Sequence, residues 1–337
     1  MSVKPNPERE RLEAILRRFS RPGVVVVGDI VADQFLYGEI SRVSREAPVF
    51  ILRHERTETL PGGAANCALN LASLGSKVSL VGVMGDDETG RALLAKLSEA
   101  GVSCRGIRMI AGRRTTTKVR ILAGQAHSTR QQVIRVDYED EPLAGNGSLR
   151  EQLIAGLRHE IAEADALIIS DYNYGVADEA MSEVVREAVR ERQIPVFVDS
   201  RFSLSRFPDF TSATPNEAEV EQLLDRKLTD ECAFEEACEA LRARLGLKAL
   251  LVTRGGRGMV LFEEGREPLR LEAIGAREPV DGTGAGDTVI ATYALAIACG
   301  ADFADAARLA NHAGGWVVMK RGTATINSQE LLNSIRH

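Results

Sequence analysis

The feature that most limits how this chain can fold is an alternation of short, mostly apolar runs with longer segments of helical periodicity. The runs span residues 24–27, 166–170, 195–199 and 249–253. Helical patterns include residues 177–192, 232–245, 289–299 and 303–313. Apolar strands that alternate with helices form a mostly parallel sheet covered by helices on both faces. We therefore predict an α/β fold, in a single domain spanning residues 1–337.

Two stretches interrupt this alternation, at about residues 34–56 and 115–137. Both consist of short segments rich in β-forming residues that alternate with polar ones, such as Phe35-Leu36-Tyr37 and Val133-Ile134-Arg135-Val136. We expect these segments to form a small sheet that stands off the main one. Such a sheet would serve as a lid over an active site, as a surface that joins two subunits, or as both.

Charge and hydropathy exclude several classes of partner. The net charge is −6 without a basic block, which argues against a nucleic-acid surface. No apolar run approaches the roughly 18 residues of a membrane span, and the N-terminus has no apolar leader. The five cysteines lack C-x-x-C spacing and suggest reduced thiols rather than a metal site. We expect a cytoplasmic protein without nucleic-acid or membrane partners.

The glycine-rich loop at residues 281–287 is the first candidate for chemistry. It precedes an apolar helix, whose free backbone amides would bind an anion such as phosphate. The Asp287 carboxylate beside that anion suits a base for a hydroxyl that attacks phosphorus. The loop fits neither a dinucleotide motif, because Asp287 occupies the third glycine position, nor a Walker loop, because no Gly-Lys-Ser/Thr follows. A plain turn before a core helix is the alternative.

Two further groups lie near the first strand and a helix start. Asp29 and Asp33 follow residues 24–27, at the strand end where open α/β sheets bind ligands, and either could accept hydrogen bonds from hydroxyls. The alternative is that one of them caps the next turn. Gly62 and Gly63 would let the backbone approach a ligand, with the Asn66 amide to bind it. They could equally serve helix–strand packing.

Two more loops suggest a nucleotide and its metal. Asn216 and Glu219 lie three residues apart at a helix start, where an amide and a carboxylate suit hydrated Mg²⁺ carried by phosphates. The same pair also fits an N-cap and its capping-box partner. Residues 253–258 are rich in glycine after a strand, and they would hold a ribose and phosphates or form a hairpin turn into residues 259–262.

Taken together and in this order, the motifs resemble those of the ribokinase-like (PfkB) carbohydrate kinases over nearly the whole chain. Residues 62–66 and 281–287 look like the two family signatures, and residues 216–219 look like the Mg²⁺ and nucleotide motif. The resemblance implies a ribokinase-like fold and an ATP-dependent sugar kinase. The implied cofactors are ATP and Mg²⁺, with a monovalent cation as a further candidate.

The resemblance also implies roles for individual residues. Asp287 would be the catalytic base, with Gly284, Ala285 and Gly286 supplying the anion-binding amides. Asp33, Gly63 and Asn66 would bind the sugar, beside the candidates Asp29 and Gly62. The implied nucleotide-site residues are Asn216, Glu219, Thr253, Gly255, Gly258 and Asn311, of which Asn216 and Glu219 would bind Mg²⁺ through water.

Within this family the sequence is most similar to the D-glycero-D-manno-heptose 7-phosphate kinases, at residues 38–49, 117–120, 131–137 and 322–325. This likeness implies phosphorylation of the anomeric hydroxyl to the 1,7-bisphosphate, on the route to ADP-heptose and lipopolysaccharide, by a stand-alone kinase. Arg42, Arg120 and Arg135 would reach the substrate phosphate from the lid.

The chain departs from those kinases at two usual lysines, where Tyr174 and Arg201 stand. The same chemistry on another sugar is therefore one alternative. A sugar- or nucleotide-sensing module without catalysis is another. We also expect a homodimer formed through the lid.

Overall fold

A computed structural model describes residues 6–125, 130–143, 147–275 and 280–336. Its main feature is a nine-stranded sheet, which is parallel from β5 to β11 and ends in an antiparallel pair. In spatial order the strands are β13 (Leu269–Leu271), β12 (Met259–Glu263), β11 (Ala249–Thr253), β10 (Ser212–Ala213), β9 (Val196–Ser200), β8 (Ala166–Asp171), β1 (Gly23–Gly28), β4 (Lys77–Gly85) and β5 (Ser103–Ile110). The predicted α/β fold is confirmed.

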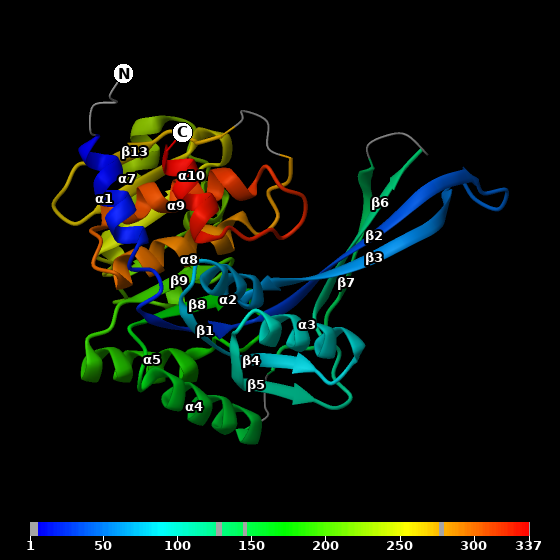
Figure 1. The fold of residues 1–337 in the computed structure, drawn as a ribbon, viewed down its shortest axis with the longest axis horizontal. Coiled ribbons are helices and arrows are strands. Elements are labelled where there is room, and N and C mark those ends of the chain that lie inside the picture. The colour runs from blue at the N-terminus through cyan, green and yellow to red at the C-terminus, as the bar shows by residue number, and fades with distance from the viewer. Residues whose placement is uncertain (1–5, 126–129, 144–146, 276–279, 337) are drawn as a thin grey trace.

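Helices cover both faces of this sheet and create two separate hydrophobic cores. One core includes residues of α1 (Pro7–Leu16), α2 (Ala64–Ser73), α3 (Glu88–Glu99), α8 (Ala285–Ala298), α9 (Phe303–Val317) and α10 (Ser328–Arg336). The other includes residues of α4 (Gly147–Ile161), α5 (Glu179–Arg192), α6 (Glu217–Leu224) and α7 (Glu231–Arg244). In Figure 1, α2, α8 and α9 lie above the sheet and α4 and α5 below it.

The central strands are apolar on both faces because they supply both cores. In β1, Val24 and Val26 belong to the core under α2 and α8, whereas Val25 and Val27 belong to the core under α4 and α5. Successive side chains of a strand point to opposite faces, so an uninterrupted apolar run marks a strand covered on both sides. Residues 24–27 are therefore all apolar because alternate side chains of β1 enter different cores.

The second sheet has four strands in the order β3-β2-β6-β7. They are β2 (Ile30–Val43), β3 (Phe50–Gly63), β6 (Thr117–Gly124) and β7 (Gln131–Tyr138). Figure 1 shows these strands extending to the right, away from the main body. The predicted lid is present, and its first hairpin is longer than residues 34–56 because β2 begins almost directly after β1. Residues 126–129 of the predicted segment 115–137 lie outside the described part.

Two details bear on the site. Helix α8 begins at Ala285 rather than at residue 289, so Gly286 and Asp287 lie in its first turn. In the lid, Asp33 lies opposite Lys118 on the neighbouring strand, and Arg120 lies opposite Arg135. This strand register places all four side chains on one face of the sheet. No helix within the described ranges is long and apolar enough to cross a membrane.

Candidate active site

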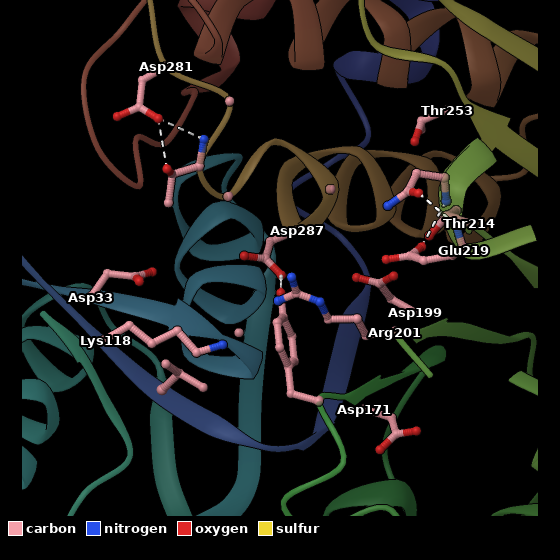
Figure 2. A pocket seen from close by; sticks show the side chains of 18 of the residues that line it. Asp33, Lys118, Asp171, Asp199, Arg201, Thr214, Glu219, Thr253, Asp281 and Asp287 are labelled. Carbon is pink, nitrogen blue, oxygen red and sulfur yellow. Dashed lines mark hydrogen bonds between the residues drawn. The ribbon is translucent and has the colours of Figure 1, made fainter. Parts of the chain in front are cut away.

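A cavity of about 480 Å³ lies between the lid and the carboxyl ends of the parallel strands. Asp171, Asp199 and Thr253 line it from β8, β9 and β11. In Figure 2 the lid residues Asp33 and Lys118 lie on the left, Asp199 and Glu219 on the right, and Asp287 between them. Ligands of open α/β sheets bind at this edge, so the cavity is the candidate active site.

Most of the predicted site residues meet here or in an adjoining cavity. Those that line the first cavity are Asp33, Gly63, Arg120, Arg135, Asn216, Glu219, Thr253, Gly284, Gly286 and Asp287. Those that line the second cavity are Thr253, Gly255, Gly258, Ala285, Gly286 and Asn311. Asp29, Gly62 and Asn66 line neither of these two cavities. Each of those three has a different position, described below.

Helix α8 points its N-terminus at the cavity. Its N-cap is Gly284, which has a φ of 77° and provides no side chain to cap the free amides. A Cβ atom at this position would lie 2.5 Å from Asn66 Nδ2, so only glycine fits. Ala285 lines the second cavity, but its amide donates to the Gly282 carbonyl at 3.3 Å and is therefore not one of the free amides predicted to bind the anion. The helix end is therefore a candidate anion site, with Gly284 and Gly286 bordering the first cavity.

The Asp287 carboxylate is buried and held at both oxygens. Asn66 Nδ2 donates to Oδ2 at 2.8 Å, and the Tyr172 hydroxyl donates to Oδ1 at 3.1 Å. Burial raises the pKa of Asp287 to about 7, against the lowering effect of these two hydrogen bonds. A carboxylate with a pKa near 7 is well matched to accept a proton from a sugar hydroxyl at neutral pH.

Asn66 is therefore a partner of Asp287 rather than a wall of the cavity. Its amide oxygen accepts a hydrogen bond from Asn70 Nδ2 at 3.2 Å, which fixes the amide orientation. Asn70 in turn accepts one from the Thr288 hydroxyl at 3.0 Å. This corrects the implied role of Asn66 in direct sugar binding, since its buried NH₂ group is directed at the carboxylate.

Asp33 and Lys118 form the left side of the cavity in Figure 2, and the lid arginines Arg120 and Arg135 line the same cavity. Asp33 makes an ion pair with Arg120, and burial nevertheless raises the pKa of the Asp33 carboxyl. A Cβ at Gly62 would lie 2.4 Å from Asp33 Oδ2. Gly62 thus leaves room for the Asp33 carboxylate and does not itself reach the cavity.

The structure also corrects the prediction for Asp29. Its carboxylate accepts hydrogen bonds from the backbone amides of Tyr172 (2.8 Å), Tyr174 (3.0 Å) and Val176 (3.1 Å). A carboxylate that is buried and occupied in this way binds a loop, not a substrate hydroxyl. Of the two alternatives for Asp29, the structure therefore supports a role in organising a loop, not a hydrogen bond to a substrate hydroxyl.

Asn216 and Glu219 form the capping box of α6. The Glu219 amide donates to Asn216 Oδ1 at 2.9 Å, and the Asn216 amide donates to Glu219 Oε2 at 2.8 Å. Both residues line the cavity as well, so the cap and a ligand role are compatible. Burial raises the pKa of Glu219.

Asp199, which the sequence reasoning did not single out, lies beside Glu219. Burial, and then the Glu219 charge, raise the pKa of Asp199 well above its usual value. Two carboxylates that repel each other at a cavity wall fit a divalent cation. Among the described residues, no three His, Cys, Asp or Glu side chains converge on one point. Mg²⁺ would thus need water and phosphate oxygens as additional ligands. The position of Asp199 at the end of an apolar run was the available signal.

The second cavity, of about 250 Å³, is lined mostly by apolar and glycine residues. It shares Thr253, Gly282 and Gly286 with the first cavity. Residues 253–258 form the turn of the β11–β12 hairpin, as the structural alternative predicted. Asn311 donates to the Glu272 carbonyl at 2.7 Å at its border. An apolar cavity joined to an anion site suits a nucleotide base next to its phosphates.

Comparison with known proteins agrees with this geometry. Residues 21–330 match the model of the pfkB family carbohydrate kinases. The chain belongs to this family. It is therefore a sugar kinase, an ATP-dependent phosphotransferase with an alcohol group as acceptor, of a kind that generally uses Mg²⁺.

Its curated relatives include two proteins named bifunctional protein HldE. The protein of Trichlorobacter lovleyi is 38% identical over 97% of this chain and 66% of its own length. The protein of Pseudomonas aeruginosa is 41% identical over 95% of this chain and 65% of its own length. This chain thus spans about two thirds of the length of these relatives.

Solved structures show the same fold. Arabidopsis thaliana ribokinase complexed with ribose and ATP is 23% identical, with a TM-score of 0.72 over 94% of this chain and 99% of that one. Escherichia coli phosphofructokinase-2 in complex with substrates and products is 18% identical, with a TM-score of 0.75 over 94% and 98%. The fold is ribokinase-like, with a small separate sheet as its lid.

Proposed function

We propose that this kinase transfers the γ-phosphate of ATP to the anomeric hydroxyl of D-glycero-D-manno-heptose 7-phosphate. The product would be the 1,7-bisphosphate, a precursor on the route to ADP-heptose and lipopolysaccharide. The HldE relatives support a heptose substrate, as does the likeness of residues 38–49 and 131–137 to heptose kinases. Because such a kinase draws on cellular ATP and sugar phosphates, we also propose a cytoplasmic location.

Two cations without a carboxylate partner carry the proposal of a phosphorylated acceptor. Lys118 and Arg201 both line the cavity, and among the described residues neither has a carboxylate within ion-pair distance. At longer range the Arg201 charge acts on Asp199 and Glu219, and the Asp33 charge acts on Lys118. Arg120 and Arg135, by contrast, are paired with Asp33 and Asp137. Burial and then the Arg201 charge lower the pKa of Lys118. An anionic group of the substrate would relieve this repulsion and satisfy both cations.

The proposed chemistry follows from the positions of the charged groups. Asp287 accepts the proton of the sugar hydroxyl, whose oxygen then forms a bond to the γ-phosphorus while the bond to the ADP oxygen breaks. The amides of Gly284 and Gly286 stabilise the charge on the transferred phosphoryl group. Asp199 and Glu219 would hold Mg²⁺, which neutralises charge on the nucleotide phosphates when it is bound.

The two positions where heptose kinases usually have lysine have different surroundings here. Arg201 lines the cavity and keeps a positive charge there, with a planar guanidinium in place of an ammonium group. Tyr174 does not line the cavity, and its hydroxyl donates to Glu139. We therefore assign Arg201, together with Lys118, to the substrate phosphate.

A panel of acceptors tests this proposal. ADP release is measured with heptose 7-phosphate, unphosphorylated heptose, ribose, fructose and fructose 6-phosphate, with and without K⁺ for the predicted monovalent-cation effect. Phosphorus NMR of the product identifies the phosphorylated oxygen. We expect the highest kcat/KM for heptose 7-phosphate. A higher kcat/KM for another sugar would replace the heptose assignment, and absence of turnover with every acceptor would favour a sensing module.

We further propose that the chain is one domain and that its lid joins two subunits. Ile134 and Val136 of β7 are exposed and apolar, and they pair with Ile121 and Val119 on one face. That face is opposite to the one that carries Lys118 and Arg120. A second copy of the chain is the occupant that would cover this face and leave the cavity side open.

A further inference from the structure

Tyr172 joins the cavity to the predicted base. It follows β8 directly, and its hydroxyl donates to Asp287 Oδ1 at 3.1 Å. Its ring lies 5.3 Å from the Lys118 ammonium. Asn66 holds the other oxygen of the carboxylate from α2. The two donors come from α2 and from the loop after β8, and each holds a different carboxylate oxygen, so together they fix the carboxylate plane.

The loop that carries Tyr172 is itself anchored by two buried carboxylates. Asp29 accepts hydrogen bonds from three of its backbone amides. Asp171 accepts one from the Asn173 amide at 3.0 Å and one from the Ser200 hydroxyl at 2.7 Å, and it pairs with Arg206 at 3.0 Å. A loop held at this many points has little freedom to withdraw the Tyr172 hydroxyl from Asp287.

The hydroxyl remains a donor throughout the working pH range. Burial and the Asp287 charge raise the pKa of Tyr172 well above 10, so the phenol stays protonated. Donation to Asp287 stabilises the ionised carboxylate, and the hydrogen bond from Tyr172 accordingly lowers the pKa of Asp287. The other titratable groups that act on Asp287, or on which it acts, come from several elements: Asp33 on β2, Cys67 on α2, Lys118 on β6 and Asp199 on β9.

We propose that Tyr172 is a positioning residue that holds Asp287 in its ionised, proton-accepting form, and that Asp29 acts on the base indirectly by fixing the Tyr172 loop. This inference rests on the proposed role of Asp287 as the base. On this view Tyr172 and Asp29 do more than pack the loop: together they keep Asp287 ionised.

The variant Tyr172→Phe tests the inference, since it removes the hydroxyl and keeps the ring under Lys118. We expect the acidic limb of the kcat–pH profile to move upward by about one pH unit, as loss of one hydrogen bond to a charged group implies. At pH 7 kcat would fall roughly fivefold, and above pH 9 it would return to the wild-type value. Infrared difference titration against Asp287→Asn measures the same shift in the Asp287 carboxyl without any sugar.

Tyr174→Phe is the matched control, because it removes a hydroxyl from the same loop that contacts Glu139 instead. We expect no shift of the acidic limb in this variant. Asp29→Asn should move the limb upward, and the double variant with Tyr172→Phe should move it no further than Tyr172→Phe alone.

The possible results separate the two proposals. Full turnover in Asp287→Asn would overturn the proposed base and the inference with it. A loss of turnover in that variant, combined with an unshifted carboxyl pKa in Tyr172→Phe, would overturn the inference alone. A loss of kcat in Tyr172→Phe that is equal at every pH would also overturn the inference alone. If Asp29→Asn fails to fold, the Tyr172→Phe titration decides.

Discussion

At the scale of single residues, the Asp287 carboxylate combines a proposed catalytic role with a destabilising effect. Its pKa is raised from 3.8 to about 7 because the group is buried. Ionising it in the folded protein therefore lowers the free energy of unfolding. The penalty is absent below about pH 4, grows as the pH rises from about 4 to about 7, and is constant above that. Active-site groups often reduce stability in this way, because catalysis needs a charge where packing favours none.

We predict opposite effects of Asp287→Asn on activity and on stability. Without the base, kcat should fall by about 10²–10⁴-fold, whereas the Kd for ATP should change little. Above pH 7 the variant should be more stable than wild type by on the order of 4 kcal/mol, and the difference should vanish near pH 4. Steady-state kinetics, calorimetric ATP titration and thermal unfolding at both pH values measure these effects. A variant less stable at pH 8 would contradict the electrostatic account.

Lys118 provides a second prediction. Lys118→Met removes a cavity cation that has no ion-pair partner among the described residues. The kcat/KM for heptose 7-phosphate should fall at least about tenfold, with a smaller change for unphosphorylated heptose. Arg42→Met is the matched control. The sequence predicted that Arg42 would reach the substrate phosphate, but in the structure Arg42 is an exposed lid cation that does not line the cavity. An equal loss for both sugars would show that Lys118 does not recognise the substrate phosphate.

At the scale of elements, the start of α8 determines where the proposed phosphoryl site and the proposed base lie relative to each other. The helix presents its free amides and, in the same turn, Asp287. The first residue of the turn must be glycine, because the chain there has a positive φ and touches Asn66. One backbone conformation therefore sets both the proposed anion site and the Asn66 contact that holds the proposed base.

Two glycine variants separate these effects. Gly284→Ala should lower stability by about 1–3 kcal/mol and displace Asn66, so both the melting temperature and kcat should fall. Gly286→Ala meets no atom within 4 Å and should leave the melting temperature unchanged. The added methyl group would still enter the phosphate site and raise the KM for ATP. Equal stability losses in the two variants would contradict the steric argument.

The lid provides the prediction for assembly. Ile134→Asp places a charge on the exposed face of β7, where a second subunit would pack. We expect sedimentation at the rate of a monomer, whereas Met319→Asp, at a similarly apolar and exposed site outside the lid, should leave the dimer intact. A wild-type protein that sediments as a monomer would refute the proposed dimer.

At the scale of the whole molecule, the site exists because two sheets meet. The main sheet supplies Asp171, Asp199 and Thr253 at its carboxyl edge, and the lid supplies Asp33, Lys118 and two arginines. Strand β2 begins at Ile30, directly after β1 ends at Gly28, so the lid leaves the main sheet at the edge where the cavity forms. This short connection limits how far the lid can move from the strand ends.

The sequence by itself determined the features that depend on near neighbours. Apolar runs of the β1 kind predict strands covered on both faces, and the alternation predicts the α/β class. The glycines and acid of residues 281–287 predict an anion site with a carboxylate beside it. Each of these patterns depends on residues within about one turn or strand, where periodicity and backbone freedom act directly.

Only the tertiary structure distinguished residues with the same local pattern. Asp29 and Asp33 follow the same strand, yet one binds a loop more than 140 residues away and the other faces the cavity. The contact of Tyr172 with Asp287 and the proximity of Asp199 to Glu219 likewise join distant segments. Such contacts depend on strand order and lid position, which are set by the packing of both cores and cannot be read from a local pattern.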